Sequence, residues 1–267
     1  MICTDFQYDG VRLSDMGYMI CQFDDSSGFA SSTAGSQLTF TKVSRNSGRY
    51  FLLSGSRYDV PFETTFSICK PTGKQFTLAE YAELMRWLNR PDFHDLYIGY
   101  DDEDCDYDDV HFRGTFNIDK VEFYGKLVGF DLTFTSDGPF AYGEQRTYNF
   151  SLTDSSTYTI FEESDEVGYV YPDSLVITCG SAGNLRITNS IEDRSTYVAN
   201  VSSGESLTFE STVSTLTSSN TSHVVMNDFN FTFFRLANTL TSRKNVISST
   251  LPCTISLSYT PRRKVVF

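Results

Sequence analysis

The chain of 267 residues is acidic, with 34 Asp and Glu against 21 Lys and Arg and a formal net charge of −13. A protein that binds nucleic acid by neutralising phosphates would carry the opposite charge. No apolar run approaches the roughly 20 residues of a membrane span, and MICTDFQYDG has neither a basic start nor an apolar run. We therefore expect a soluble protein made in the cytoplasm, without a signal peptide or membrane contact.

The acidic charge is unevenly distributed. Residues 1–141 carry 12 basic and 22 acidic side chains, a net charge of −10, whereas residues 142–267 carry 9 and 12, a net charge of −3. A strongly acidic first half is suited to line a passage that nucleic acid must cross without sticking. The six cysteines are scattered singly, without metal-ligand spacing, so we expect free buried thiols rather than disulfides.

The first predicted elements are strands. Asp9-Gly10 between alternating apolar residues predicts a hairpin, and further strands are expected at 16–20, 38–43 and 50–53, with a turn at 44–49. The segment 24–35, DDSSGFASSTAG, is expected to be a loop, either solvated or in contact with a partner.

One helix is predicted, over residues 78–89. Thr77 followed by Glu80 is a capping box, in which each side chain satisfies a free backbone N–H of the other residue, and Pro91 ends the helix. Leu78, Tyr81, Met85 and Leu88 share one face at helical spacing, which we expect to lie on a sheet. Trp87 is expected to be a packing residue.

An acidic segment, DDEDCDYDD, follows at residues 101–109. Its D-x-D-x-D start is typical of a calcium loop, but Tyr107 replaces the required Gly and Arg113 replaces the bidentate Glu, which excludes an EF-hand. A solvated hairpin tip is the favoured interpretation, and an irregular calcium site is the alternative.

Tyr124-Gly125-Lys126 predicts a second hairpin, and Asp137-Gly138-Pro139 predicts a domain boundary. We expect an N-terminal β domain at 1–141 and a β-sandwich at 142–267. The sandwich strands are expected at 147–152, 169–171, 175–179, 185–189, 197–201, 206–209, 224–226, 229–234 and 254–259. The basic end at 262–264 is either solvated or a docking tail for an acidic partner.

No catalytic, cofactor-binding or metal-binding residues are predicted. His94, His111 and His223 lie apart, Asp95 points to the opposite strand face from His94, and no nucleophile elbow, HExxH, Walker loop or GxGxxG occurs. Acid pairs for glycoside hydrolysis stay open, because none of the many carboxylates is singled out. We therefore predict that the protein is not an enzyme.

Five stretches, in order, carry a resemblance to a known family: FQYDG with LSDMG at 6–17, RWLN at 86–89, FDLTF to DGPFAY at 130–142, GYVYP to LRITN at 168–189, and SYTPRRK at 258–264. Together they resemble the distal tail protein of long-tailed bacteriophages that infect Gram-positive bacteria. The resemblance implies a mainly β fold, with a ring-forming N-terminal domain that contains one α-helix and a galectin-like C-terminal β-sandwich.

The resemblance also implies a function. It predicts a homo-hexameric ring at the virion tail tip, with the tail tube protein above, a hub or lysin protein below, receptor-binding or side-fibre proteins attached outside, and a channel that DNA crosses. Two alternatives stay open: a carbohydrate-binding adhesion module, and another tail component such as a tube protein or a side-fibre adaptor. The absence of tryptophan from 142–267 argues against sugar binding.

Overall fold

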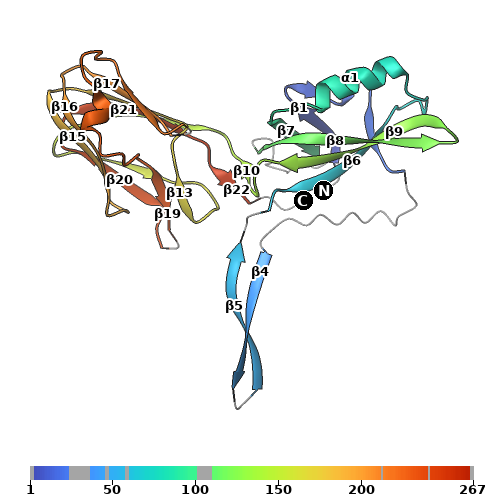
Figure 1. The fold of residues 1–267 in the computed structure, drawn as a ribbon, viewed down its shortest axis with the longest axis horizontal. Coiled ribbons are helices and arrows are strands. Elements are labelled where there is room, and N and C mark those ends of the chain that lie inside the picture. Colours follow the sequence, from blue (N-terminus) through green and yellow to red (C-terminus); the bar gives the residue numbers. More distant parts are fainter. Residues whose placement is uncertain are drawn as a thin grey trace. The chain divides into compact units, whose positions relative to one another are not determined.

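A computed structural model of the chain describes residues 3–23, 37–45, 48–57, 60–100, 110–211, 213–239 and 241–264. These residues divide into two compact units (Figure 1). Unit 1 contains the described residues up to Tyr142 together with Lys264, and unit 2 is Gly143–Arg263. The predicted loop at 24–35 and the acidic segment at 101–109 lie outside the described residues, so the calcium alternative is not addressed by the structure.

Unit 1 is built on one antiparallel sheet of seven strands, in the order β2-β1-β7-β8-β9-β6-β3. The strands are β1 (Cys3–Tyr8), β2 (Val11–Arg12), β3 (Met19–Cys21), β6 (Glu63–Cys69), β7 (His94–Tyr100), β8 (Phe112–Phe123) and β9 (Lys126–Ser136). A short 3₁₀ turn (Ser14–Met16) precedes β3, and β10 (Ala141–Tyr142) closes the unit. Two further strands, β4 (Gln37–Arg45) and β5 (Gly48–Arg57), form a two-stranded sheet of their own.

Both predicted hairpin turns are confirmed. Asp9 and Gly10 have φ angles of 51° and 78° between β1 and β2, and Tyr124 and Gly125 have 49° and 73° between β8 and β9. Two consecutive residues with positive φ are the requirement of the type I′ turn, whose twist matches that of the flanking strands. Local turn chemistry therefore fixes the register of both hairpins.

Helix α1 (Leu78–Leu88) begins where the sequence predicts and ends one residue earlier, with Asn89 as its C-cap. The Glu80 amide donates to Thr77 Oγ1 at 3.3 Å, and the Thr77 amide donates to Glu80 Oε2 at 2.7 Å, which completes the capping box. Lys70, at the end of β6, donates to both carboxylate oxygens of Glu80 at 2.6 Å. The start of the helix is thus tied to the strand that precedes it.

The buried face of α1 matches the predicted one in part, because Leu88 is buried and Tyr81 packs against the core. Leu84, Trp87 and Leu88 are buried, whereas Leu78 is 83% exposed. Leu78 is the first residue of the helix and lies outside the core. Trp87 packs as predicted, and its indole N–H donates to the backbone oxygen of Tyr8 at 3.0 Å.

The core of unit 1 is rich in aromatic side chains. Phe6 lies between Phe66 and Phe116, with ring centroids 5.2 and 5.6 Å away, and stacks on Trp87 at 6.0 Å. Tyr81 stacks on Phe130 at 5.5 Å from the other end of α1. Such ring pairs add packing energy beyond area burial. The helix is therefore fastened to both β1 and β9.

Unit 2 is a β-sandwich. A five-stranded antiparallel sheet, β11-β21-β14-β17-β18, and a four-stranded sheet, β12-β20-β15-β16, enclose one apolar core, and β13 pairs with β19 beside them. In each of the two main sheets a late strand lies between earlier ones: β21 between β11 and β14, and β20 between β12 and β15. The strands are β11 (Arg146–Leu152), β12 (Thr157–Phe161), β13 (Gly168–Val170), β14 (Ser174–Cys179), β15 (Gly183–Asn189), β16 (Ser195–Val201), β17 (Ser206–Glu210), β18 (Thr215–Ser218), β19 (Leu236–Asn238), β20 (Lys244–Ser249), β21 (Cys253–Tyr259) and β22 (Arg262–Arg263).

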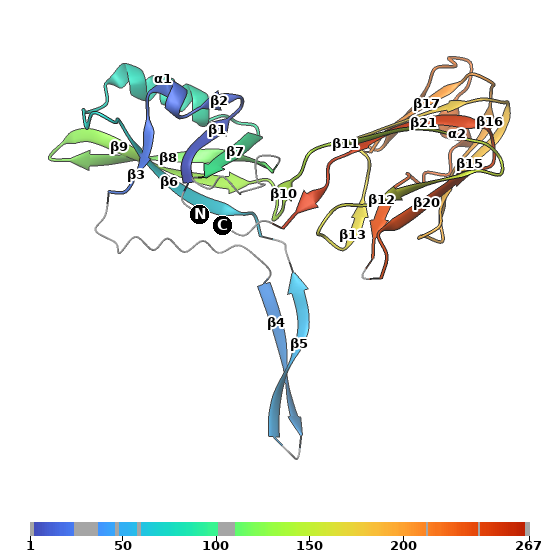
Figure 2. The ribbon, with the colours of Figure 1, turned by 180° about the vertical axis from the view of Figure 1, so that it is seen from behind.

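Two predicted strands of unit 2 are wrong. Residues 224–226 lie largely in a short helix, α2 (Val225–Asp228; Figure 2), and 229–234 is not a strand. Asn230 explains the second error, because its side chain accepts from the Tyr197 and Thr232 amides and Phe231 takes a φ of 55°, which breaks an extended run. The strands β12, β18, β19, β20 and β22 were not predicted.

Among the described residues, no helix is long and apolar enough to cross a membrane. The five cysteines in this part of the chain are free; Cys179 and Cys253 are buried and the other three are partly buried. Burial raises the pKa of the Cys3, Cys21 and Cys179 thiols to about 12, which keeps them protonated and unreactive at neutral pH.

Candidate functional site

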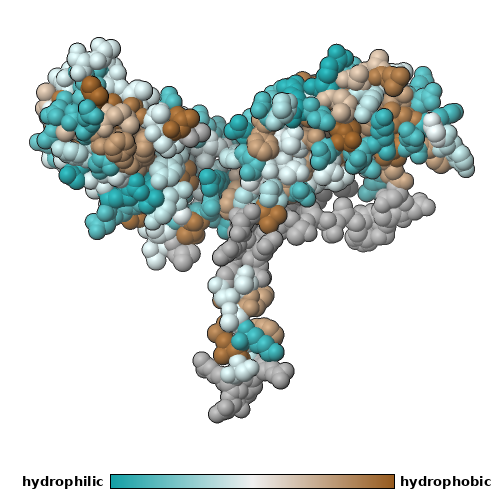
Figure 3. All heavy atoms as spheres, in the orientation of Figure 1, coloured by the Kyte–Doolittle hydropathy of each residue, from teal (hydrophilic) through white to brown (hydrophobic). Residues whose placement is uncertain are grey.

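The hairpin formed by β4 and β5 carries a group of exposed apolar side chains. Five large apolar side chains of its described residues are between 48% and 68% exposed, and Figure 3 shows apolar residues along the hairpin. They are Phe40, Tyr50, Phe51, Leu52 and Leu53.

The strand register places these side chains on both faces of the hairpin. Phe40 lies opposite Leu53, and Lys42 opposite Phe51, so these four residues share one face. On the other face Thr41 lies opposite Leu52, and Val43 opposite Tyr50. A sheet normally buries one face and solvates the other. This hairpin has an apolar face on each side and no third strand among the described residues.

An isolated two-stranded hairpin is marginally stable in water. Completing the burial of five half-exposed apolar side chains would contribute roughly 5 kcal/mol, on the scale of the stability of a small domain. Exposed apolar patches of this kind mark protein interfaces. We call the apolar residues 40, 43 and 50–53 the hairpin surface, and it is the candidate functional site of unit 1.

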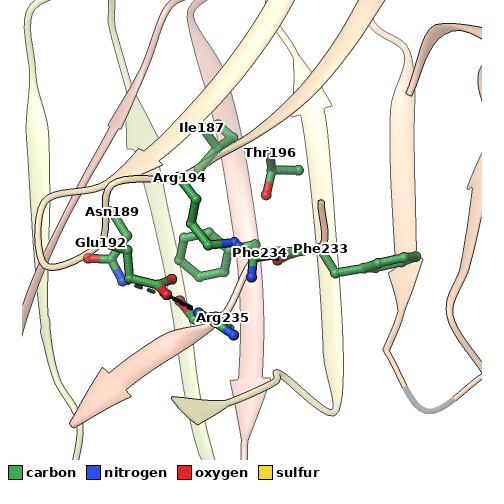
Figure 4. A pocket seen from close by; sticks show the side chains of 8 residues that line it. All are labelled: Ile187, Asn189, Glu192, Arg194, Thr196, Phe233, Phe234 and Arg235. Atoms are coloured by element: carbon green, nitrogen blue, oxygen red, sulfur yellow. Dashed lines mark hydrogen bonds and ion pairs between the residues drawn. The ribbon is translucent and has the colours of Figure 1, made fainter. Parts of the chain in front are cut away.

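Unit 2 has one small hollow among its described residues that is worth testing as a ligand site. Its volume is about 10 Å³, which is room for about one water molecule. Figure 4 shows the charged side chains at its edge already engaged: Arg235 pairs with Glu192 at 2.5 Å, and Arg194 donates to the Phe233 carbonyl at 3.0 Å. The lining residues are Ile187, Asn189, Glu192, Arg194, Thr196, Phe233, Phe234 and Arg235. The hollow is therefore part of the sandwich packing.

The three histidines each lie beside acidic side chains. His94 is 3.3 Å from Asp9, and Asp95 lies 3.9 Å from His111, so the neighbours in sequence do not pair. Burial lowers the pKa of His111 even though the charges of Asp95 and Asp137 raise it. In the part of the chain that the structure describes, no group of three His, Cys, Asp or Glu is placed to hold a metal ion.

The basic end of the chain is not a free docking tail. Arg262 pairs with Glu166 at 2.7 Å, and Arg263 donates to the backbone oxygen of Glu163 at 2.6 Å. Both guanidinium groups are used within unit 2. The sequence reveals the charge of this segment but not the acidic partners, which lie about a hundred residues earlier in the chain.

Family comparison assigns both halves of the chain. The family model described as "Phage tail protein N-terminal domain" matches residues 1–138, and the one described as "Phage tail C-terminal domain" matches residues 140–259. The chain therefore belongs to this family of phage tail proteins and is a component of the virion tail. Comparison with curated proteins gives no match.

Among solved structures, the chain is similar to the crystal structure of Dit (gp 19.1) of phage SPP1, described as a paradigm of the hub adsorption apparatus in phages that infect Gram-positive bacteria. The TM-score is 0.63 at 12% sequence identity, and the match covers 97% of this chain and 99% of that chain. The fold is thus that of a distal tail protein, and the resemblance predicted from the sequence is confirmed.

Proposed function

We propose that six copies of this chain form a ring at the distal end of the phage tail, which joins the tail tube to the tail tip and the host-adhesion apparatus. In this role the protein is structural and has no catalytic activity. The tail tube protein binds one side of the ring and a hub or lysin protein binds the other. Receptor-binding or side-fibre proteins attach to unit 2.

The observation that carries this proposal is the hairpin surface. A closed ring needs one contact that repeats from each copy to the next, between two different patches of the chain. A hairpin with two apolar faces supplies such a contact, because a neighbouring copy can cover what its own copy leaves exposed. The fold likeness to a hub protein over nearly the whole chain supports the same assembly.

The test is native mass spectrometry of the purified chain, with negative-stain imaging. We expect a hexamer, or two hexamers back to back, with a central hole. The variant Phe40→Ser/Phe51→Ser removes apolar area from one face of the hairpin and should lower the oligomer to a monomer. A wild-type chain that stays monomeric at high concentration and with tail tube protein present overturns the proposal.

A matched control separates the hairpin from exposed apolar residues in general. Phe161, in unit 2, is 61% exposed, close to the 68% of Phe51. The variant Phe161→Ser should leave the hexamer intact. Equal loss of the hexamer in both variants would mean that the hairpin surface is not the ring contact.

We further propose that the ring encloses a channel for DNA in transit. The net charge of −10 on residues 1–141 would keep the passing genome from binding the wall, since like charges repel. Reversing the charge of acids that face the hole in the imaged ring should slow DNA ejection. Unchanged ejection would remove the charge argument while leaving the ring itself standing.

A carbohydrate-binding role for unit 2 is the second candidate. Tyr169 and Tyr171 are about half exposed, and the Arg235 guanidinium carbon lies 3.4 Å from the centre of the Tyr169 ring. Exposed aromatic rings held in place are suited to stack on sugars. Binding of the full chain to a cell-wall glycan array, abolished by Tyr169→Ala, would support this role.

The imaging experiment also tests the remaining alternatives. A stacked polymer in place of single rings would indicate a tube protein. A monomer that binds side fibres would indicate a side-fibre adaptor.

A further inference from the structure

His223 lies between two carboxylates in unit 2. It occupies the segment between β18 and α2, and its side chain is 7% exposed. Its Nδ1 atom is 2.6 Å from Glu205 Oε1, and its Nε2 atom is 3.0 Å from Asp228 Oδ2. The Glu205 side chain is fully buried, and that of Asp228 is 26% exposed.

With both carboxylates ionised, this geometry favours a ring in which both nitrogens carry hydrogen. An ionised carboxylate only accepts hydrogen bonds, and a neutral imidazole has one nitrogen that also only accepts. A neutral ring would therefore direct a lone pair at one of the two carboxylates. Two charge-assisted hydrogen bonds form only when the ring is the imidazolium cation.

The two carboxylates connect four segments of unit 2 to the His223 ring. Glu205 accepts from the Ser218 hydroxyl at 2.6 Å and from the Ser202 amide at 2.7 Å. Asp228, in α2, accepts from the Asn200 side chain in β16 at 3.1 Å. Strand β16, the β16–β17 turn, β18 and α2 thus meet at this ring.

Protonation of the ring is favoured by its surroundings. Burial by itself lowers the pKa of His223, but the hydrogen bonds and charges of Glu205 and Asp228 outweigh it, so the pKa is raised. Burial likewise raises the pKa of Glu205, but the donors Ser218, Ser202 and His223 leave it lowered. Glu205 and Asp228 are the charged groups that act on the ring among the described residues, and Glu205 also acts on the buried Cys179 thiol.

Helix α2 is too short to be stable without contacts to the rest of unit 2. It has four residues and no side-chain hydrogen bond at its N-cap. Val225 and the following Phe229 are its buried anchors, whereas Val224 and Met226 are exposed. Helices this short are not stable without tertiary contacts. The ionic contact between His223 and Asp228 is therefore one of the contacts, together with buried Val225 and Phe229, that hold α2 against β16 and β18.

We propose that His223 is a proton-operated clasp, which fastens α2 to the β16–β17 turn and β18 while the ring is protonated and releases α2 when the ring becomes neutral. Because the pKa is raised in the folded state, the clasp contributes its full stability below the ordinary His pKa near 6.5. That contribution is lost as the pH rises through the folded value. Helix α2 is thus held against the β16–β17 turn and β18 in mildly acidic solution and is held less tightly in alkaline solution. The inference does not rest on the proposed ring.

The test is hydrogen exchange of the full chain, followed by mass spectrometry at pH 6 and pH 9 and corrected for intrinsic exchange rates. Peptides covering 224–230 should be at least tenfold better protected at pH 6. The variant His223→Gln should remove this pH dependence. His111→Gln, which changes a histidine of unit 1, should preserve it. Equal protection of the wild type at both pH values overturns the proposal.

A second measurement needs no variant. The chain has three histidines, so exchange at each ring Cε1 carbon, followed by mass spectrometry against pH, gives each pKa separately. The His223 pKa should lie above 6.5 in the folded chain and return to its ordinary value in urea. A folded-state value at or below 6.5 would contradict the clasp even if His223→Gln fails to fold.

Discussion

Replacing Glu80 with Gln removes one negative charge from the start of α1 while keeping the shape of the side chain. The carboxylate accepts from Lys70 and from the Thr77 amide and hydroxyl. Gln still accepts from Thr77, since Gln also serves in capping boxes. The change therefore isolates the charge interaction with Lys70, at a site where strand β6 is tied to the helix.

The pKa of Glu80 gives the scale of the effect. It falls from 4.5 to about 2, first because of the hydrogen bond from Lys70 and then because of those from Thr77. At 1.36 kcal/mol per pH unit this corresponds to roughly 3 kcal/mol. The side chain is 33% exposed, and solvent screening reduces this to about 1 kcal/mol for Glu80→Gln. The pKa is depressed, so the contribution is present above pH 4.5 and lost as the pH falls towards 2.

Urea unfolding followed by Trp87 fluorescence measures this change. Trp87 is the one tryptophan of the chain and lies in α1, so its signal reports on unit 1. We expect Glu80→Gln to lower the free energy of unfolding by about 1 kcal/mol at pH 7 and by less at pH 3. Lys70→Gln should give a similar loss, and the double variant little more.

The matched control is Glu83→Gln, an exposed carboxylate on the same helix. It should change the free energy of unfolding by less than about 0.5 kcal/mol. If Glu80→Gln and Glu83→Gln behave alike at pH 7, the capping network does not stabilise unit 1 as reasoned. A Glu80→Gln effect of constant size down to pH 2.5 would refute the electrostatic origin.

Three further variants test packing and buried polar groups. Gly114→Ala should destabilise unit 1 by about 3 kcal/mol, seen as a lower Tm, because a Cβ there would lie 2.3 Å from the backbone oxygen of Thr135; an unchanged Tm would contradict the close approach. Asn245→Leu should cost unit 2 about 3 kcal/mol in urea unfolding followed by circular dichroism, since this fully buried amide holds both Ala237 backbone groups. Glu162→Gln should stabilise unit 2 by about 1 kcal/mol at pH 8, because burial raises the pKa of Glu162 and its Oε2 has no hydrogen-bond partner. Because the pKa of Glu162 is raised, its ionisation lowers the stability of unit 2 as the pH rises above 4.5. A Tm of the Gln variant below that of the wild type at pH 8 would contradict this reasoning.

Features set by neighbouring residues were predictable from the sequence. The two type I′ turns, the capping box of α1 and most strands of the sandwich depend on residues within a few positions of one another. The helix face shows the limit of this reasoning. Leu78 lies at helical spacing from Tyr81 and Met85, and Leu84 lies at helical spacing from Tyr81 and Leu88. Only the position of the strands beneath α1 decides that Leu84 is buried and Leu78 is not.

The candidate sites depend on distant residues and were largely missed. The apolar stretch at 50–53 is predicted as a strand, and nothing in the local sequence indicates that its hairpin pairs with no third strand among the described residues. The sequence does contain a signal for two apolar faces, because the four consecutive apolar residues at 50–53 lack the alternation of a half-buried strand. The His223 cluster draws Glu205 and Asp228 from separate segments. Their spacing in the sequence has no motif that would have connected them.

The position of β21 in unit 2 has a consequence for synthesis of the protein. This strand, Cys253–Tyr259, is made about a hundred residues after β11, yet it lies between β11 and β14. The five-stranded sheet cannot be completed until residue 259 has left the ribosome, whereas the described strands of unit 1 are all available more than a hundred residues earlier. Unit 1 can therefore fold before unit 2 during translation. A premature stop shortly before residue 253 would leave a folded first unit joined to an unfolded second one.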